Sequence, residues 1–442
     1  MMFNNILNFS QNKLNILYRN SAILQNIDTI ILPLILLVFA ASTFMQSDYI
    51  GFIALSVIFL TLIKIFTKPN EKISFSIVDL LILVYFLIVI VSLFGSTLFA
   101  LSLKGFLKTF IYIGFYYSLS QYLKSNKEKI PVILGAIALC ISAEAILGVF
   151  QSTLHLEQIS TWQDTSNLNP EDVLSRVYGS LKPLNPNLYG GYLIAGLPVV
   201  IGVIFNFASK KHLKLTICSA ILTTAVMYAI LQTGCRGAYL AMMLIIGAVF
   251  IVSAKFFWNK YKKIYISIIS ITTALFLMII TFVNSLRLRF LSIFAMRSDS
   301  SNSFRFNVYN SSLQMFKDNW LLGIGVGNKN FREIYGLYMK TGFDALSSYN
   351  IYLETAVESG IFALILFLAI LGKLSYDAVA SIFKSKDTND IIIISSCIIG
   401  IWAMMFHGLV DTVFFRPQLQ FIFWTLAAII NCKNQVQKSE NN

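Results

Sequence analysis

Hydrophobic and polar positions along this chain alternate on the scale of whole helices. Apolar runs of about 18 or more residues, enough to cross a bilayer as a helix, recur through most of the sequence, with short polar turns between them. The pattern predicts about twelve membrane-spanning helices. They lie near residues 29–45, 50–66, 77–97, 100–119, 131–151, 187–206, 215–232, 237–254, 264–283, 349–371, 390–411 and 417–431.

These spans predict an all-α polytopic integral membrane protein. We expect one transmembrane helical domain over residues 28–432, preceded by a cytoplasmic N-terminal segment, 1–27, and followed by a disordered cytoplasmic tail, 433–442. Two connections are long enough to form substantial outer loops, 152–186 and 284–348.

Composition supports the membrane class. The chain is 57% hydrophobic and 12% charged, whereas soluble domains contain about 25% charged residues. Its net charge of +13 is spread between the spans, which argues against a nucleic-acid partner. The five cysteines form no CxxC pair and no zinc-binding spacing, so we expect no metal site.

Lysines and arginines occupy opposite sets of turns. Alternate turns are rich in lysine, and the positive-inside rule places them, with both termini, on the cytoplasmic side of the cytoplasmic (inner) membrane. These turns lie near residues 64–72, 124–129, 209–214, 255–263 and 384–386. Of the nine arginines, all but Arg19 then fall on the outer side: Arg176, Arg236, Arg287, Arg289, Arg297, Arg305, Arg332 and Arg416.

Outward arginines need a reason other than topology, because lysine already sets the orientation. Arginine binds phosphate and carboxylate in a bidentate manner that lysine cannot reproduce. The pattern predicts an outer basic site for an anionic ligand, although contacts with lipid headgroups or structural carboxylates would also explain it. Within LQTGCRGAYL, Arg236 stands in a tight outer turn between Gly234 and Gly237, which leave room for close approach.

The pattern of apolar residues in the large loop, residues 284–348, predicts one amphipathic helix on the bilayer surface or over the helix bundle. Its apolar positions from Phe304 onward are Phe306, Tyr309, Leu313 and Phe316. The following GIGVGN segment, 323–328, has no P-loop lysine and follows no strand, so we interpret it as a compact turn close to another backbone.

Two pairs of charged residues lie one helical turn apart. Glu354 and Glu358 share a face near the start of a span. There the helix dipole could stabilise their carboxylates, or the carboxylates could hold arginines or act as acid and base. Lys104 and Lys108 share a face within the span at 100–119, where they could line a polar interior, extend to the headgroups or have a function.

Four motifs in a fixed order on one predicted face carry a family resemblance. They are RVYGSLKPLNPNLYGGYL, TGCRGAYLA, NWLLGIGVGNKNF and YNIYLETAVESGIFALILF. The set resembles the O-antigen ligase and polymerase superfamily over about residues 140–372. It looks closest to a cyanobacterial branch labelled as inorganic-carbon (bicarbonate) transporters, to which LRLRFLSIFAMRSDSSNSFRFNVY and LEQISTWQD are also similar.

The resemblance implies transfer of a saccharide from an undecaprenyl-pyrophosphate carrier to an acceptor at the outer membrane face, without a metal or other cofactor. Arg236 matches an arginine in the short outer turn of the ligases, and Arg305 a second basic residue in their large loop. The implied catalytic residues are Arg236, Arg305, Tyr349 and Glu354. The implied substrate-binding residues are Arg176, Asn187, Arg287, Arg289, Asn350 and Glu358.

One position departs from the family. Ligases carry a His-Asn pair where the large loop re-enters the membrane, and this chain has Tyr349-Asn350. Tyrosine, with a pKa near 10, is a poor base at neutral pH. His155 could reach the site only through the fold, and His407, one turn before Asp411, could form a buried polar pair. Three roles therefore stay open: glycosyl transfer on a lipid-linked saccharide, transport of a small anion such as bicarbonate, and a non-catalytic membrane partner.

Overall fold

The computed structural model describes residues 2–45, 47–69, 71, 73–154, 176–294 and 300–441. Every regular element in these ranges is a helix, which confirms the all-α class. The elements are α1 (Met2–Asn20), α2 (Ala22–Gln25), α3 (Ile27–Phe44), α4 (Ser47–Thr67), α5 (Ile77–Gly95), α6 (Phe99–Ser125), η1 (Lys127–Lys129), α7 (Ile130–Thr153), α8 (Pro186–Ser209), α9 (Leu213–Gln232), α10 (Arg236–Phe282), α11 (Asn284–Leu291), α12 (Ser300–Asp318), α13 (Asn328–Tyr335), α14 (Ile351–Lys384), α15 (Thr388–His407), η5 (Val413–Phe415) and α16 (Pro417–Asn441).

Nine helices in the described ranges are long and apolar enough to cross a membrane. Each of the predicted spans has a helical counterpart, but two of them, 237–254 and 264–283, lie in the single helix α10, which leaves helical geometry at Tyr261. The spans predicted at 100–119 and 417–431 correspond to α6 and α16, which are not among the nine. The chain is therefore a multi-pass membrane protein.

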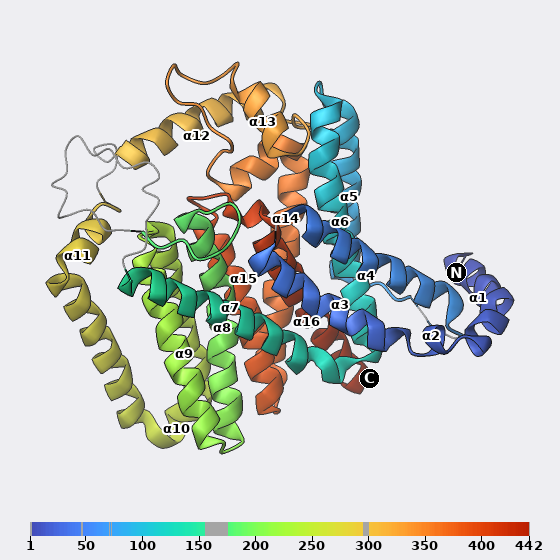
Figure 1. Ribbon diagram of the computed structural model, residues 1–442, viewed down its shortest axis with the longest axis horizontal. Coiled ribbons are helices and arrows are strands. Elements are labelled where there is room, and N and C mark those ends of the chain that lie inside the picture. The colour runs from blue at the N-terminus through green and yellow to red at the C-terminus, as the bar shows by residue number, and fades with distance from the viewer. Residues whose placement is uncertain are drawn as a thin grey trace.

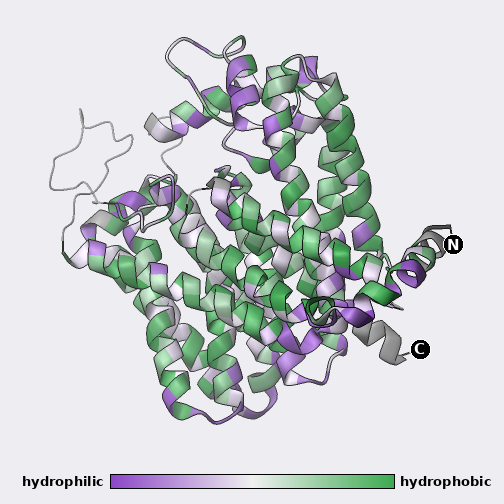
Figure 2. Cartoon of the chain, turned by 45° about the vertical axis from the view of Figure 1, so that its right-hand side comes forward, coloured by the Kyte–Doolittle hydropathy of each residue, from purple (hydrophilic) through white to green (hydrophobic). Residues whose placement is uncertain are grey.

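The helices form a bundle with α8 and α15 near its centre (Figure 1). In the most apolar stretches of α8 and α15, 78% and 72% of the residues are buried, against 22% in α10. Hydrophobic residues run along the helices, whereas hydrophilic residues gather at helix ends and in the segments around α12 and α13 (Figure 2). The exposed apolar sides of peripheral helices such as α10 are surfaces suited to lipid.

The lysine-rich turns meet at one end of the bundle, which we call the lysine end. Lys124 Nζ donates to Ser74 O at 2.6 Å, and Lys255 Nζ donates to Ser385 O at 3.1 Å. Both terminal helices reach the same end, since Gln11 of α1 donates to the carbonyl groups of Ile65 and Glu71 and Lys433 of α16 pairs with Asp390. The side of the membrane on which this end lies stays a prediction.

The opposite end, which we call the arginine end, is built from the first residues of α8, α10 and α14, the last residues of α9 and α15, and the helices α11 to α13. The motifs that carry the family resemblance lie here. The segments that the chain spaces far apart in sequence are thus brought together by the antiparallel course of the helices.

The C-terminal tail corrects one expectation. The sequence predicts disorder for residues 433–442, whereas α16 continues to Asn441. Residues 433–441 contain no proline or glycine, and their lysine, glutamine and glutamate residues favour a helix once the preceding apolar turns have started it.

α14 is interrupted at Gly360, where φ is 78°. The GIGVGN turn fills the interruption, because Ile324 N and Gly325 N each donate at 2.9 Å to the carbonyl groups of Val357 and Glu358. A Cβ atom on Gly360 would lie 2.1 Å from Leu321 O. The compact turn predicted near another backbone is therefore present, and it holds the large loop against α14.

α12 is the helix that the large loop predicts, and it packs over the bundle against α14. Its buried side chains include Val308 and Met315, which join Val357 of α14 in a second apolar core. The buried face differs from the expected one, because Phe306 and Leu313 are 36% and 45% exposed. Contact with α14, rather than apolar periodicity alone, decides which face is covered.

Candidate functional site

Four of the predicted arginines gather at the arginine end: Arg176, Arg236, Arg289 and Arg305, which we call the arginine cluster. They come from four separate segments, namely the end of the first long loop, the start of α10, α11 and α12. Electrostatic contacts link Arg289 to Arg176 and Arg236, and Arg176 to Arg305. The fold thus concentrates positive charge that the sequence distributes over more than a hundred positions.

Arg236 and Arg289 are held by the tight turn between α9 and α10 and by α11. Arg289 Nε donates to Gly234 O at 2.8 Å, and Gly234 has a positive φ of 61° that suits glycine. Arg236 Nη1 donates to Ser292 O at 3.0 Å and to Ser292 Oγ at 3.2 Å. Each guanidinium therefore touches the segment that carries the other, which fixes α11 over the turn.

Arg176 is oriented by a chain of side-chain hydrogen bonds that ends on Asp411. Its Nε donates to Thr233 O at 2.8 Å, and its Nη2 donates to Asn187 Oδ1 at 2.5 Å. Asn187 Nδ2 in turn donates to Asp411 Oδ2 at 2.9 Å. Asp411 Oδ1 accepts the backbone N–H groups of Thr412 and Val413, so this carboxylate is fully engaged in positioning.

Arg305 of α12 completes the cluster on the side of the large loop. Its Nη2 lies 3.9 Å from Asp411 Oδ2, and its Cζ lies 5.9 Å from the centre of the Tyr349 ring. Tyr349 has a positive φ of 54°, an unusual backbone conformation for a residue other than glycine. Tyr309 Oη donates to Tyr349 O at 3.3 Å, so α12 also contacts the peptide at which the loop re-enters the membrane.

The electrostatics of the site favour an anion. Burial, followed by repulsion from Arg176 and Arg236, lowers the pKa of Arg289 to about 10. Burial also lowers the pKa of Arg176. Among the described side chains, the ion pair formed by the arginine cluster is that of Arg305 with Asp411. Four guanidinium groups brought close together supply hydrogen-bond donors and positive charge that suit an anionic ligand.

Tyr349 is unsuited to act as a base. Burial, followed by the nearby Asp411 carboxylate, raises the pKa of Tyr349 to about 12, and the opposing effect of Arg305 is smaller than that of Asp411. The phenol therefore stays protonated at neutral pH and can donate a hydrogen bond to a ligand beside Arg305.

The remaining predicted residues have other surroundings. Arg287 is exposed, and its Nη2 donates to Asn284 Oδ1 at 2.6 Å. Asn350 caps the first turn of α14 and donates to Leu409 O at 3.1 Å. Glu354 and Glu358 are buried, where they accept the backbone N–H groups of Ser348 and Gly327. The contacts of both carboxylates described here are with the backbone of the large loop.

The histidines do not restore the missing family histidine within the described residues. His155 and Arg297 lie outside those residues. His407 is buried, and its Nε2 lies 3.3 Å from Cys235 Sγ, directly before Arg236. The sequence did not predict that Asp411 would connect to Arg176 and Arg305, because Asp411 was considered only as a partner of His407. The signal available was a carboxylate just beyond a span that ends at the arginine end.

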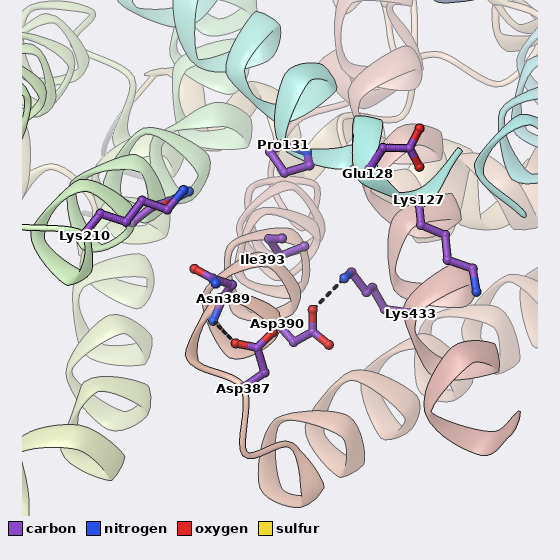
Figure 3. Close-up of a pocket in the computed structure, with 10 residues that line it drawn as sticks. Lys127, Glu128, Pro131, Lys210, Asp387, Asn389, Asp390, Ile393 and Lys433 are labelled. Carbon is purple, nitrogen blue, oxygen red and sulfur yellow. Dashed lines mark hydrogen bonds and ion pairs between the residues drawn. The ribbon is translucent and has the colours of Figure 1, made fainter. Parts of the chain in front are cut away.

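A cavity of about 300 Å³ lies away from this cluster, at the lysine end (Figure 3). It is lined by both signs of charge, and its three acidic groups are engaged: Asp390 pairs with Lys433, Asp387 caps α15, and Glu128 pairs with Lys129. The arginine cluster is therefore the better candidate site for an anion. Among the described residues, no three His, Cys, Asp or Glu side chains are placed to hold a metal ion.

Comparison with known proteins agrees with the location of the cluster. A search of curated proteins finds no match to the chain. Residues 218–368, about a third of the sequence, match the family model described as O-antigen ligase. The matched region contains Arg236, Arg289, Arg305 and Tyr349. This match supports a membrane glycosyl-transfer function, and it shows that the matched region is similar to the O-antigen ligase family.

Proposed function

We propose that this protein transfers a saccharide from an undecaprenyl-pyrophosphate carrier to an acceptor, at the outer face of the cytoplasmic membrane. The observation that carries the proposal is the arginine cluster, in which four guanidinium groups lie close together, with Arg305 beside Asp411 and Arg176 connected to Asp411 through Asn187. The cluster lies at the end of a membrane bundle, where a lipid-linked anion can enter from the bilayer with its headgroup at the surface. Three of its arginines lie within the O-antigen ligase region.

In the proposed reaction, the arginines act on the leaving group. The bond between the sugar's anomeric carbon and the pyrophosphate oxygen breaks, and its electron pair leaves with the pyrophosphate. An acceptor hydroxyl forms the new glycosidic bond and gives up its proton. Negative charge grows on the leaving oxygen, and preorganised arginines stabilise that charge more than they stabilise the ground state.

The residues of the arginine cluster and its neighbours would have separate roles in the reaction. Arg236 and Arg289, held on adjoining segments, would bind the pyrophosphate oxygens. Asp411 would position Arg176 through Asn187 and would approach Arg305 directly. Because Tyr349 stays protonated, it would serve as a hydrogen-bond donor, and the acceptor proton would leave with the pyrophosphate or to water.

Transport of a small anion has less support. Interrupted membrane helices often form the ion sites of transporters, because they expose backbone groups. α14 is interrupted at Gly360, and an anion would bind the N–H groups that begin its second half, but Ile361 N there donates to Trp320 O at 2.9 Å. The interruption is filled by the protein's own loop, which bonds this N–H group.

The proposal is tested by comparing two arginines on neighbouring segments in a transfer assay. We expect Arg236→Ala to lower the transfer rate of a lipid-linked saccharide by about 100- to 1,000-fold, the effect of losing one preorganised donor. Arg287→Ala is the matched control, because Arg287 is exposed and bonds Asn284. Arg236→Lys keeps the charge and separates loss of bidentate binding from loss of the fold. Equal rates for Arg236→Ala and Arg287→Ala would contradict the proposal.

A further inference from the structure

Two lysines of α6 stand on a membrane-facing surface and have no acidic partner among the residues that the structure describes. Lys104 and Lys108 are exposed, and neither forms an ion pair or a hydrogen bond within the part of the chain that the structure describes. Their neighbours Leu107 and Phe110 are also exposed, as on a lipid-facing helix surface. A lysine within a span costs up to about 2.5–3.5 kcal/mol at the centre, so a nearby anion would stabilise both side chains.

The direction of α6 places these lysines near the headgroups at the arginine end. Gly105 lies against the backbone of Val326 in the large loop, whereas Lys124 lies at the lysine end. With a rise of 1.5 Å per residue, Lys104 and Lys108 lie about 8 Å and about 14 Å along the helix from Phe99. Side chains in a helix tilt toward its N-terminus, so both ammonium groups extend toward the arginine-end headgroups.

An apolar pocket opens directly beside Lys108. Its volume is about 270 Å³, and it is formed by α4, α6 and the start of α16. Gly51 leaves space there, since a Cβ atom on it would touch only Ile111, at 3.7 Å. The other lining residues are Phe52, Leu55, Lys108, Tyr112, Pro417 and Phe421. One cation at the edge of an apolar hollow matches a lipid that has a phosphate headgroup and a hydrocarbon chain.

We propose that Lys104 and Lys108 bind the phosphate of an anionic membrane phospholipid, one chain of which lies in the pocket between α4, α6 and α16. This site is separate from the arginine cluster, whose residues come from α10, α11, α12 and the loop before α8. α16 contacts both α6 and α8, so it stands between the two sites. The bound phospholipid is a resident lipid of the bundle, and the site goes beyond the proposed transfer reaction.

The charge requirement is tested by lipid binding to the purified full-length protein, measured by native mass spectrometry with phosphatidylglycerol and phosphatidylcholine. We expect phosphatidylglycerol to bind more tightly, and Lys104→Gln with Lys108→Gln to weaken its binding by about thirtyfold. Lys214→Gln with Lys263→Gln is the matched control, because it removes the same charge from exposed positions at the lysine end. Equal binding of the two lipids, or unchanged binding by the double variant, would overturn the proposal.

A pocket-filling variant tests the apolar half of the site while keeping both charges. Leu55→Trp enlarges a half-exposed lining residue, and we expect it to weaken phosphatidylglycerol binding by about tenfold, through loss of space for the chain. Unchanged binding by this variant would place the lipid elsewhere. Tighter binding of undecaprenyl phosphate than of phosphatidylglycerol at this site would make the carrier lipid its occupant, and the phospholipid proposal would then fail.

Discussion

At the lysine end of the bundle, the most buried cations face carboxylates. Lys64, whose side chain is fully buried, lies 2.7 Å from Asp28, and Lys433 pairs with Asp390 at 2.5 Å. At the arginine end, by contrast, four guanidinium groups lie close together and raise one another's electrostatic cost, since burial and then repulsion from Arg176 and Arg236 lower the pKa of Arg289. Lys64 and Lys433 contribute to assembly of the helices, and the carboxylates that they face balance their charge. The arginines are concentrated in spite of their mutual repulsion, as expected for a site that binds an anionic ligand.

The largest effect should come from the scaffold that holds the arginine end. A Cβ atom on Gly360 would meet Leu321 O at 2.1 Å, and φ there is positive. We expect Gly360→Ala to destabilise the protein by about 3 kcal/mol and to lower the yield of folded protein, as measured by thermal unfolding in detergent.

Gly372 provides the matched control for that substitution. It lies in the same helix, α14, and a Cβ atom on it would meet nothing within 4 Å. We expect Gly372→Ala to leave stability unchanged or to raise it slightly, since alanine favours a helix more than glycine does. If both variants unfold at the same temperature, the turn does not hold the interruption of α14.

A smaller effect on stability should come from Arg289, because placing arginines close together costs folding free energy. The pKa of Arg289 falls to about 10 in the folded protein, below its usual range. A cation with a lowered folded pKa costs folding free energy at neutral pH, and this cost is relieved only as the pH rises through about 10. We therefore expect Arg289→Gln to stabilise the ligand-free protein by about 1 kcal/mol while weakening its binding of pyrophosphate.

The ion pair of Lys433 with Asp390 provides the corresponding test at the lysine end. Lys433→Gln removes a charge that is already balanced by Asp390, so we expect it to lower stability by at most about 1 kcal/mol and to leave pyrophosphate binding unchanged. Thermal unfolding with and without ligand measures both variants. A loss of stability in Arg289→Gln as large as that in Lys433→Gln would remove the distinction between the two ends.

Local chemistry explains what the sequence predicted well. The spans and the grouping of the lysine turns follow from apolar length and alternation, which depend on residues close in sequence. Arg236 and Arg289 could be placed at one end because the count of spans fixes which turns meet. Tyr349 could be recognised from its place at the loop's re-entry.

Long-range packing explains what the sequence did not predict. The role of Asp411 depends on a hydrogen bond to Asn187 across 224 positions, which no local pattern contains. Gly360 lies within an apolar span, and only its contact with the GIGVGN turn distinguishes it from a glycine such as Gly372. The buried face of α12 is likewise decided by α14, which covers Val308 and leaves Leu313 exposed.

The most direct test of the central claim is the binding of undecaprenyl pyrophosphate to the purified protein, compared with the neutral alcohol undecaprenol. If the arginine cluster binds the pyrophosphate, the alcohol should bind at least about tenfold more weakly, and Arg236→Ala should remove most of the difference. Equal affinity for the two lipids, or a difference that survives Arg236→Ala, would contradict the assignment of the arginine cluster as the site for a lipid-linked anion.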